Sequence, residues 1–142
     1  PRPVVAACTG HALAAGAIIL MTCDLRVGAR GEFKIGLPEL TIGMPLPFFA
    51  TELARDRISK RHLTRVTALG NVYDPVGAVD AGFLDEVAEP DELVATAIQR
   101  AAALTGISRG GLVRTRTTAR GAIAEEIRAG LDEDLSHFSV NS

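Results

Sequence analysis

The hydrophobic positions of the chain follow two patterns, and one gives way to the other near residue 47. In the first part, short apolar stretches alternate with turn residues. Residues 3–8 are apolar on both faces, which predicts a strand buried in a parallel sheet. After a break at Thr9-Gly10, residues 13–22 are apolar nearly all round, which predicts a buried helix. Strand, small-residue turn and helix together form the first half of a βαβ unit.

Apolar spacing and helix-ending residues predict the rest of the elements. Asp74 followed by Pro75 is typical of a helix start, and Gly82 of its end. The other predicted elements are short strands at residues 25–29 and 33–36, a helix marked by Phe48, Leu53 and Ile58, a helix from the N-cap Ser59 to Gly70 that buries Leu63, Val66 and Leu69, an extended stretch at 83–87, and helices over 90–104 and about 111–137.

Composition limits the partners of the chain. Of its 142 residues, 47% are hydrophobic and 23% are charged, and the formal net charge is −2. These values are typical of a globular domain and give no basic field for binding nucleic acid. The longest apolar run, residues 12–21, is shorter than the roughly 20 residues of a membrane span. The chain has two cysteines, Cys8 and Cys23, and enough Leu, Ile, Val and Ala to build a core, so we expect reduced thiols in a cytoplasmic compartment. Neither cysteine has a metal-ligand spacing.

Small residues dominate the turn between the first strand and the first helix, from Gly10 to Gly16. The first turn of a helix leaves backbone N–H groups unpaired and carries the positive end of the helix dipole, so a small-residue entry lets an oxyanion or a phosphate approach. The same residues also permit close packing of helix on sheet. From this stretch alone, close packing is the favoured interpretation.

Glu39 is a carboxylate with apolar residues on both sides, within residues 35–43. An apolar setting disfavours the charged form of a carboxyl group and makes it useful as a base near neutral pH. By pattern alone, however, the favoured interpretation is a solvent-facing glutamate on an alternating strand.

Taken together, these two stretches resemble the crotonase family, the enoyl-CoA hydratase/isomerase superfamily. The family pattern Pro-Val-Val-Ala-Ala-x-x-Gly-x-Ala-Leu-Gly-Gly-Gly is similar to residues 3–16, Cys-Asp-x-Arg to residues 23–26, and Phe-Gly-x-Pro-Glu-x-x-x-Gly to residues 33–43. Residues 74–87 resemble a later family segment, in which a short helix ends in Gly before Leu-Val-Asp-x-Val. The resemblance covers almost the whole chain in one order, which makes it specific.

The resemblance implies an α/β fold of the ClpP/crotonase type, a spiral of ββα units followed by C-terminal helices. Within a single domain, residues 1 to about 90 would form the end of the spiral core, and residues from about 91 to 142 a helical oligomerisation region. An acyl-CoA substrate is implied, with no separate cofactor and no metal, in a homotrimer or hexamer. Because the chain starts within a core strand, we expect the C-terminal part of a larger domain that requires an N-terminal segment. Alone, it should be inactive and poorly soluble.

Roles for individual residues also follow from the resemblance. By position, the backbone amide of Ala15 would hold the thioester oxygen in an oxyanion hole and stabilise an enolate. Hydratases of the family use two glutamates, one on the first helix and one in the Pro-Glu motif. Here the helix position is Ile18, so only Glu39 remains. A single carboxylate beside an aliphatic wall suits proton transfer from C2 to C4, as in the Δ3,Δ2-enoyl-CoA isomerase branch.

The segment after the Pro-Glu motif favours the same branch. Hydratases continue with Pro-Gly-x-Gly-Gly-Thr, whereas residues 43–49 read Gly-Met-Pro-Leu-Pro-Phe-Phe. Candidates for the acyl pocket are Ile18, Leu37, Phe48 and Phe49. A hydratase-like enzyme and a non-catalytic acyl-CoA-binding protein stay open as alternatives. His62 and His137 are predicted on helix surfaces.

Overall fold

Two three-stranded sheets organise the structure, a computed structural model that describes residues 2–136. The strands are β1 (Val5–Cys8), β2 (Ala12–Leu13), β3 (Leu25–Ala29), β4 (Ile35–Gly36), β5 (Val72–Tyr73) and β6 (Glu86–Ala88). The helices are α1 (Ala15–Thr22), the 3-10 helix η1 (Glu39–Ile42), α2 (Phe48–Arg57), α3 (Lys60–Thr67), α4 (Pro75–Ala81), α5 (Leu93–Ala103) and α6 (Arg109–Ser136).

The first two strands each pair with the strand two places later in the chain. In the first sheet β1 pairs in parallel with β3, with Val5 opposite Leu25, and in the second β2 pairs in parallel with β4, with Ala12 opposite Ile35. The unit formed by β3 and β4 therefore lies beside the unit formed by β1 and β2, as one turn of a spiral lies beside the next. β6 extends the first sheet parallel to β3, and β5 closes the second antiparallel to β4. The predicted α/β spiral is confirmed.

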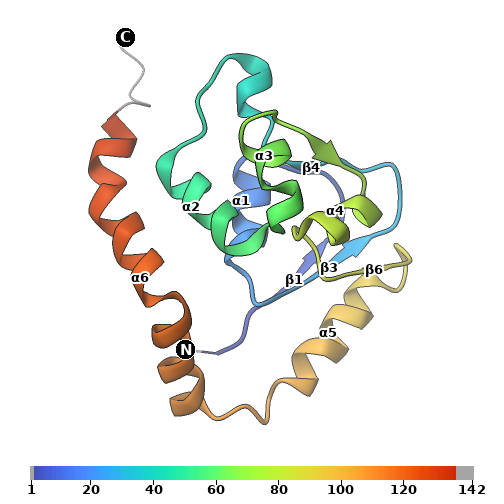
Figure 1. Ribbon diagram of the computed structural model, residues 1–142. Coiled ribbons are helices and arrows are strands. Elements are labelled where there is room, and N and C mark those ends of the chain that lie inside the picture. The colour runs from blue at the N-terminus through green and yellow to red at the C-terminus, as the bar shows by residue number, and fades with distance from the viewer. Residues whose placement is uncertain (1, 137–142) are drawn as a thin grey trace.

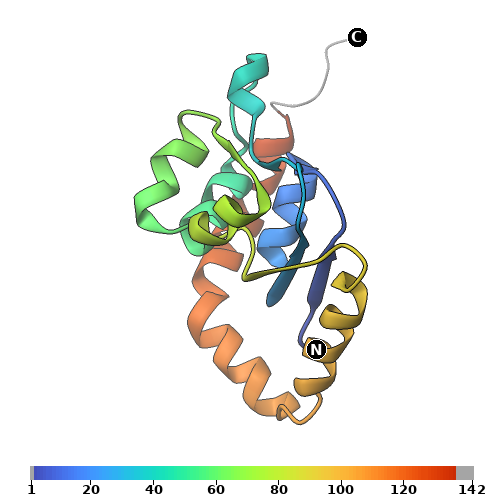
Figure 2. The same cartoon turned by 90° about the vertical axis from the view of Figure 1, so that its right-hand side faces the viewer.

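Helix α1 lies in the middle of the ribbon, with α2, α3 and α4 around it (Figure 1). The larger core cluster contains Met21 of α1, Ile35 of β4 and Phe83, all of which are buried. A smaller cluster joins Val27 of β3 to Leu93 of α5, which lies along the first sheet (Figure 2). The core thus fixes α1 and both sheets as one unit.

Burial was predicted too widely in three places. Helix α1 buries Ala17, Leu20 and Met21, but Ile19 on its other side is 63% exposed. Strand β1 lies at the edge of its sheet and is only partly buried. Leu69 is exposed because α3 ends at Thr67, before the position of Leu69 could face the core. Apolar composition alone does not say how many sides of an element are covered.

Local signals placed α4 correctly. The Asp74 carboxylate accepts a hydrogen bond from the Gly77 N–H at 2.7 Å, Pro75 begins the helix, and Gly82 ends it at a left-handed φ of 105°. Ser59 does precede α3, but its side chain makes no capping bond. Helix α5 begins at Leu93 rather than at residue 90, the predicted start.

Helix α6 runs along one side of the molecule and packs on α2 (Figure 1). Arg120 of α6 pairs with Asp56 of α2 at 2.5 Å, and Arg116 pairs with Asp24. The last inward-facing position is the buried Asp134, whereas Leu135 is exposed. Nowhere in residues 2–136 does a helix have the length and apolar character needed to cross a membrane. His137 lies outside the described residues.

Candidate active site

The parallel pairing of β2 with β4 brings the two candidate segments together. Both strands end at the same edge, where the Ala14 N–H donates to the Gly36 carbonyl at 3.1 Å. From that edge β2 leads directly into α1 at Ala15, and β4 leads through two residues into η1 at Glu39. Ligands of α/β folds commonly bind at the carboxyl ends of parallel strands. Ala15 and Glu39 thus leave adjacent strand ends within three residues of one shared hydrogen bond.

Glu39 is buried, with 8% of its surface exposed, and its Oε2 atom has no hydrogen-bond partner within residues 2–136. The interpretation of a solvent-facing glutamate on an alternating strand is therefore wrong. Thr41 turns the backbone into a 3-10 helix, because both its N–H and its hydroxyl donate to the Pro38 carbonyl. A buried carboxylate oxygen without a partner is costly in a purely structural position, so Glu39 is a candidate for contact with a ligand or a reacting proton.

Helix α1 starts with backbone amides that have no backbone acceptor among residues 2–136. Its first internal bond runs from the Ile18 N–H to the Ala14 carbonyl, so the amides of the first turn have no partner within the helix. Ala15, the first helical residue, is exposed. The positive end of the helix dipole lies there as well, and this end can stabilise a negative oxygen.

Ala14 adopts a backbone conformation that favours glycine, with φ 51° and ψ −118°. A non-glycine residue in such a sparsely populated region costs about 1–3 kcal/mol. This strain lies at the junction between β2 and α1, next to the free amides. The family pattern given for residues 3–16 has glycine at the position of Ala14.

We expect Ala14→Gly to raise the free energy of unfolding by about 1 kcal/mol, because relief of strain exceeds the entropy cost of glycine. Urea unfolding followed by circular dichroism measures the change. Ala17→Gly, within α1 at a buried position with ordinary helical geometry, is the matched control and should lower stability by a similar amount. A loss of stability in both variants would show that Ala14 is not strained.

At its other end α1 is held by Arg57 of α2. The guanidinium donates to the Met21 carbonyl at 3.0 Å and also to the Cys23 carbonyl. Burial, together with the charges of Arg26 and Arg120, lowers the pKa of Arg57. A cation at a helix C-terminus is favourable for the dipole. Sequence reasoning missed Arg57, because no local signal links it to carbonyls more than 30 residues earlier.

The four acyl-pocket candidates lie in two places. Ile18 and Leu37 both contact the larger core cluster, Ile18 from a partly buried position and Leu37 as a fully buried member. Phe48 and Phe49 begin α2 instead, where Phe48 packs on Gly130 of α6. Ile18 and Leu37 therefore share one core cluster, whereas Phe48 lies at the start of α2 against α6.

The prediction that His62 lies on a helix surface is wrong, because His62 is buried with 6% exposure. Its Nδ1 lies 3.0 Å from the Tyr73 hydroxyl and its Nε2 3.0 Å from Asp80 Oδ2. Burial raises the pKa of Tyr73, so its hydroxyl stays protonated. The ring thus joins α3, β5 and α4, which is a structural role.

Both cysteines are free thiols. Cys23 is buried and its Sγ donates to the Ile19 carbonyl. Burial raises the pKa of the Cys8 thiol, although a hydrogen bond with the backbone of Gly10 opposes this shift. A thiol with a raised pKa is a poor nucleophile. Glu39 is therefore a better candidate for the chemistry than Cys8.

Known proteins resemble this chain over most of its length. The sequence model of the family described as Enoyl-CoA hydratase/isomerase matches residues 1–138. The chain is 28% identical to the human mitochondrial enoyl-CoA delta isomerase 1 over 95% of this chain and 45% of that protein. It is 25% identical to the Escherichia coli 2,3-dehydroadipyl-CoA hydratase over 98% of this chain and 54% of that protein.

Among solved structures, an enoyl-CoA hydratase/isomerase family protein from Pseudomonas syringae superposes with a TM-score of 0.93 at 39% identity, covering 96% of this chain and 60% of that one. The chain spans about half the length of the curated relatives it matches. Sequence and fold comparisons thus point to one family.

Proposed function

Because the chain belongs to the enoyl-CoA hydratase/isomerase family, we propose that it acts as an enoyl-CoA isomerase, which shifts the double bond of a 3-enoyl-CoA to give a trans-2-enoyl-CoA in fatty-acid metabolism. One observation carries this choice: Glu39 is buried with an unpartnered Oε2, and the residue on α1 that would supply a second carboxylate is Ile18. A single carboxylate can move a proton between two carbons, but it is poorly equipped to position a water for addition.

In the proposed mechanism the Glu39 carboxylate removes a proton from C2 of the 3-enoyl-CoA. The electron pair of the broken C–H bond spreads over the dienolate and onto the thioester oxygen. The Ala15 amide, at the positive end of α1, donates to that oxygen, and one such donor is typically worth about 3 kcal/mol of barrier. Glu39 then returns the proton at C4, so the carboxylate is regenerated and the net change is an isomerisation.

The aliphatic surroundings have a role in this scheme. Ile18 and Leu37 contact the same core cluster beneath the edge at which the Glu39 segment leaves β4. An apolar wall keeps water from the dienolate, so the intermediate takes its proton back instead of reacting with solvent. The same wall would line the part of the pocket that holds the acyl chain.

Two other functions remain alternatives to this proposal. Similarity to an enzyme named as a hydratase supports hydratase-like activity, and loss of the second glutamate would also fit a protein that binds acyl-CoA without turnover. These alternatives differ in the product they form, so they can be separated by experiment.

We expect the protein, as its gene encodes it, to convert 3-hexenoyl-CoA into trans-2-hexenoyl-CoA. Chromatography of the reaction mixture measures 2-enoyl and 3-hydroxyacyl products together, and calorimetry measures binding. Formation of 3-hydroxyacyl-CoA from 2-hexenoyl-CoA at a rate comparable to isomerisation would favour a hydratase. Binding without any 2-enoyl product would favour the non-catalytic alternative and overturn the proposal.

A further inference from the structure

Helix α2 begins without a capping residue of its own. Pro47 occupies the N-cap position and makes no side-chain bond to the helix. Instead, the Phe48 N–H donates to Asp134 Oδ1 at 2.9 Å and the Phe49 N–H donates to Asp134 Oδ2 at 3.1 Å. Asp134 lies near the end of α6 and is 8% exposed. A carboxylate in this position satisfies two free amides and also meets the positive end of the α2 dipole.

Gly130, one helical turn before Asp134, contacts the same residue of α2. A Cβ atom at Gly130 would lie 3.0 Å from Cδ1 of the Phe48 ring and 3.2 Å from its Cε1. Because positions four apart share one face of a helix, Gly130 and Asp134 act together on Phe48. Helix α6 therefore holds both the ring and the backbone amide of this residue.

The segment that α6 anchors in this way starts at Glu39. In η1 the Met44 N–H donates to the Glu39 carbonyl at 3.0 Å, and Gly43 has a left-handed φ of 77°. Between Met44 and Phe48 lie Pro45, Leu46 and Pro47, and each proline fixes its own φ. The connection is short and stiff, so a shift of the Phe48 end is passed on to the Met44–Glu39 bond.

We propose that Asp134 is a positioning residue for Glu39. It fixes the far end of the η1–α2 connection and so holds the backbone of Glu39 in the place from which its carboxyl reacts. The consequence for activity rests on the proposed isomerase function, whereas the consequence for the backbone does not. By this device the C-terminal helix takes part in the site although none of its residues needs to touch the substrate.

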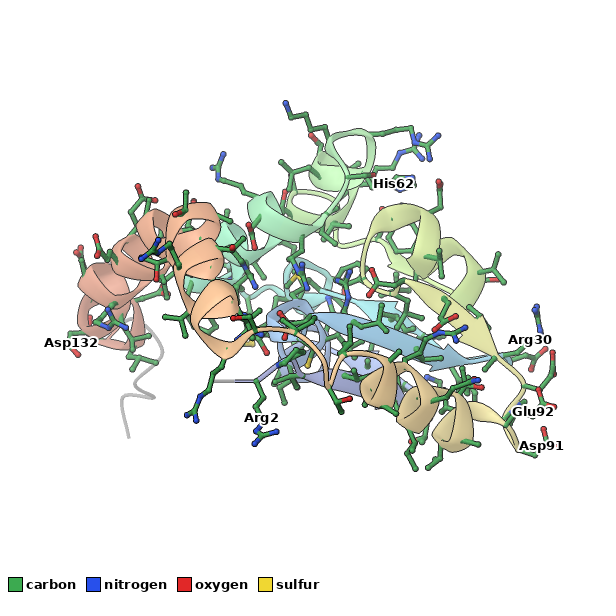
Figure 3. The ribbon with its side chains drawn as sticks, turned by 90° about the horizontal axis from the view of Figure 1, so that it is seen from below. Arg2, Arg30, His62, Asp91, Glu92 and Asp132 are labelled. Atoms are coloured by element: carbon green, nitrogen blue, oxygen red, sulfur yellow. The ribbon has the colours of Figure 1, made fainter. Side chains whose placement is uncertain are left out.

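The test compares Asp134→Ala and Asp134→Asn with Asp132→Asn in the protein as its gene encodes it. Asp132 is the matched control, because it lies on the same helix, carries the same charge and points to solvent (Figure 3). Hydrogen exchange, followed by mass spectrometry, is measured for peptides that contain Gly43 and Met44 and for peptides of β3. The kcat and KM for 3-hexenoyl-CoA are measured in parallel.

We expect exchange at Gly43 and Met44 to be about tenfold faster in Asp134→Ala, with a smaller change in Asp134→Asn and none in Asp132→Asn or in β3. The kcat should fall about tenfold while KM changes little. Unchanged exchange at Gly43 and Met44, or equal acceleration in β3, would overturn the positioning role. So would a wild-type kcat in a folded Asp134→Ala variant. If the wild type itself forms no 2-enoyl product, the proposed function fails, and the exchange result still decides the role of Asp134.

Discussion

We expect Glu39→Gln to lower the kcat of isomerisation about 10³-fold, within the range of general acid–base catalysis, and to leave the affinity for hexanoyl-CoA within about threefold of wild type. The amide has nearly the shape of the carboxyl group but cannot accept the C2 proton. Because Glu39 Oε2 has no hydrogen-bond partner among residues 2–136, the substitution breaks no hydrogen bond of that atom there. Steady-state kinetics measures the first effect and titration calorimetry the second.

Glu32→Gln is the matched control, since it makes the same chemical change at an exposed position of the β3–β4 turn. It should have the kcat of the wild type. The assignment of Glu39 as the base is contradicted if Glu39→Gln keeps a turnover close to that of the wild type. A large loss of affinity in Glu39→Gln would instead make Glu39 a binding residue.

The second large effect concerns the ion pair of Arg26 with Asp85, which ties β3 to the start of β6. Arg26 is 5% exposed, and its Nε and Nη2 donate to the two oxygens of Asp85 at 2.9 and 2.8 Å. Its Nη1 donates to the Gly82 carbonyl at 2.7 Å. The Arg26 backbone N–H also donates to Asp85, so one carboxylate fixes both the side chain and the strand.

Asp85→Asn should therefore lower the free energy of unfolding by about 3 kcal/mol, because it leaves the buried guanidinium without its counter-charge. Urea unfolding measures the change. Asp91→Asn, at an exposed position near α5, is the control and should stay within about 0.5 kcal/mol of wild type (Figure 3). A loss below about 1 kcal/mol in Asp85→Asn would mean that solvent screens the pair.

This pair also sets a dependence on pH. Burial alone would raise the pKa of Asp85, but the hydrogen bonds and the charge of Arg26 outweigh burial and hold the pKa below its usual value. The unfolded chain therefore takes up the proton at a higher pH than the folded chain does. The stability from the pair is complete above the ordinary pKa of Asp and is lost as the pH falls through the lowered pKa. The difference between wild type and Asp85→Asn should thus shrink below about pH 4.

Much of the fold follows from local sequence signals. The Asp74-Pro75 start and the Gly82 end of α4 need no distant partner, and the structure has both. Strand β3 and helix α2 were also predicted from their apolar residues. Motif order led to the family, which the match over residues 1–138 confirms.

Contacts between distant residues could not be predicted in this way. The strands β2 and β5 have two residues each, too few for a periodic pattern, and exist because both pair with β4. The cap of α2 comes from Asp134, 86 residues after Phe48. The only local hint was that Pro47, which cannot cap with its side chain, precedes the helix. The burial of Glu39 was likewise hidden, because the pattern around it also fits an exposed strand.

The fate of the C2 proton distinguishes Glu39 from solvent as the proton donor at C4, because the proposed mechanism uses the Glu39 carboxyl for both proton transfers. 3-Hexenoyl-CoA labelled with deuterium at C2 is converted in ordinary water for less than one turnover, and NMR then locates the label in the product. Since Glu39 is more than nine-tenths buried, we expect part of the deuterium removed from C2 to be found at C4. A product whose new C4 hydrogen comes entirely from solvent would contradict this expectation.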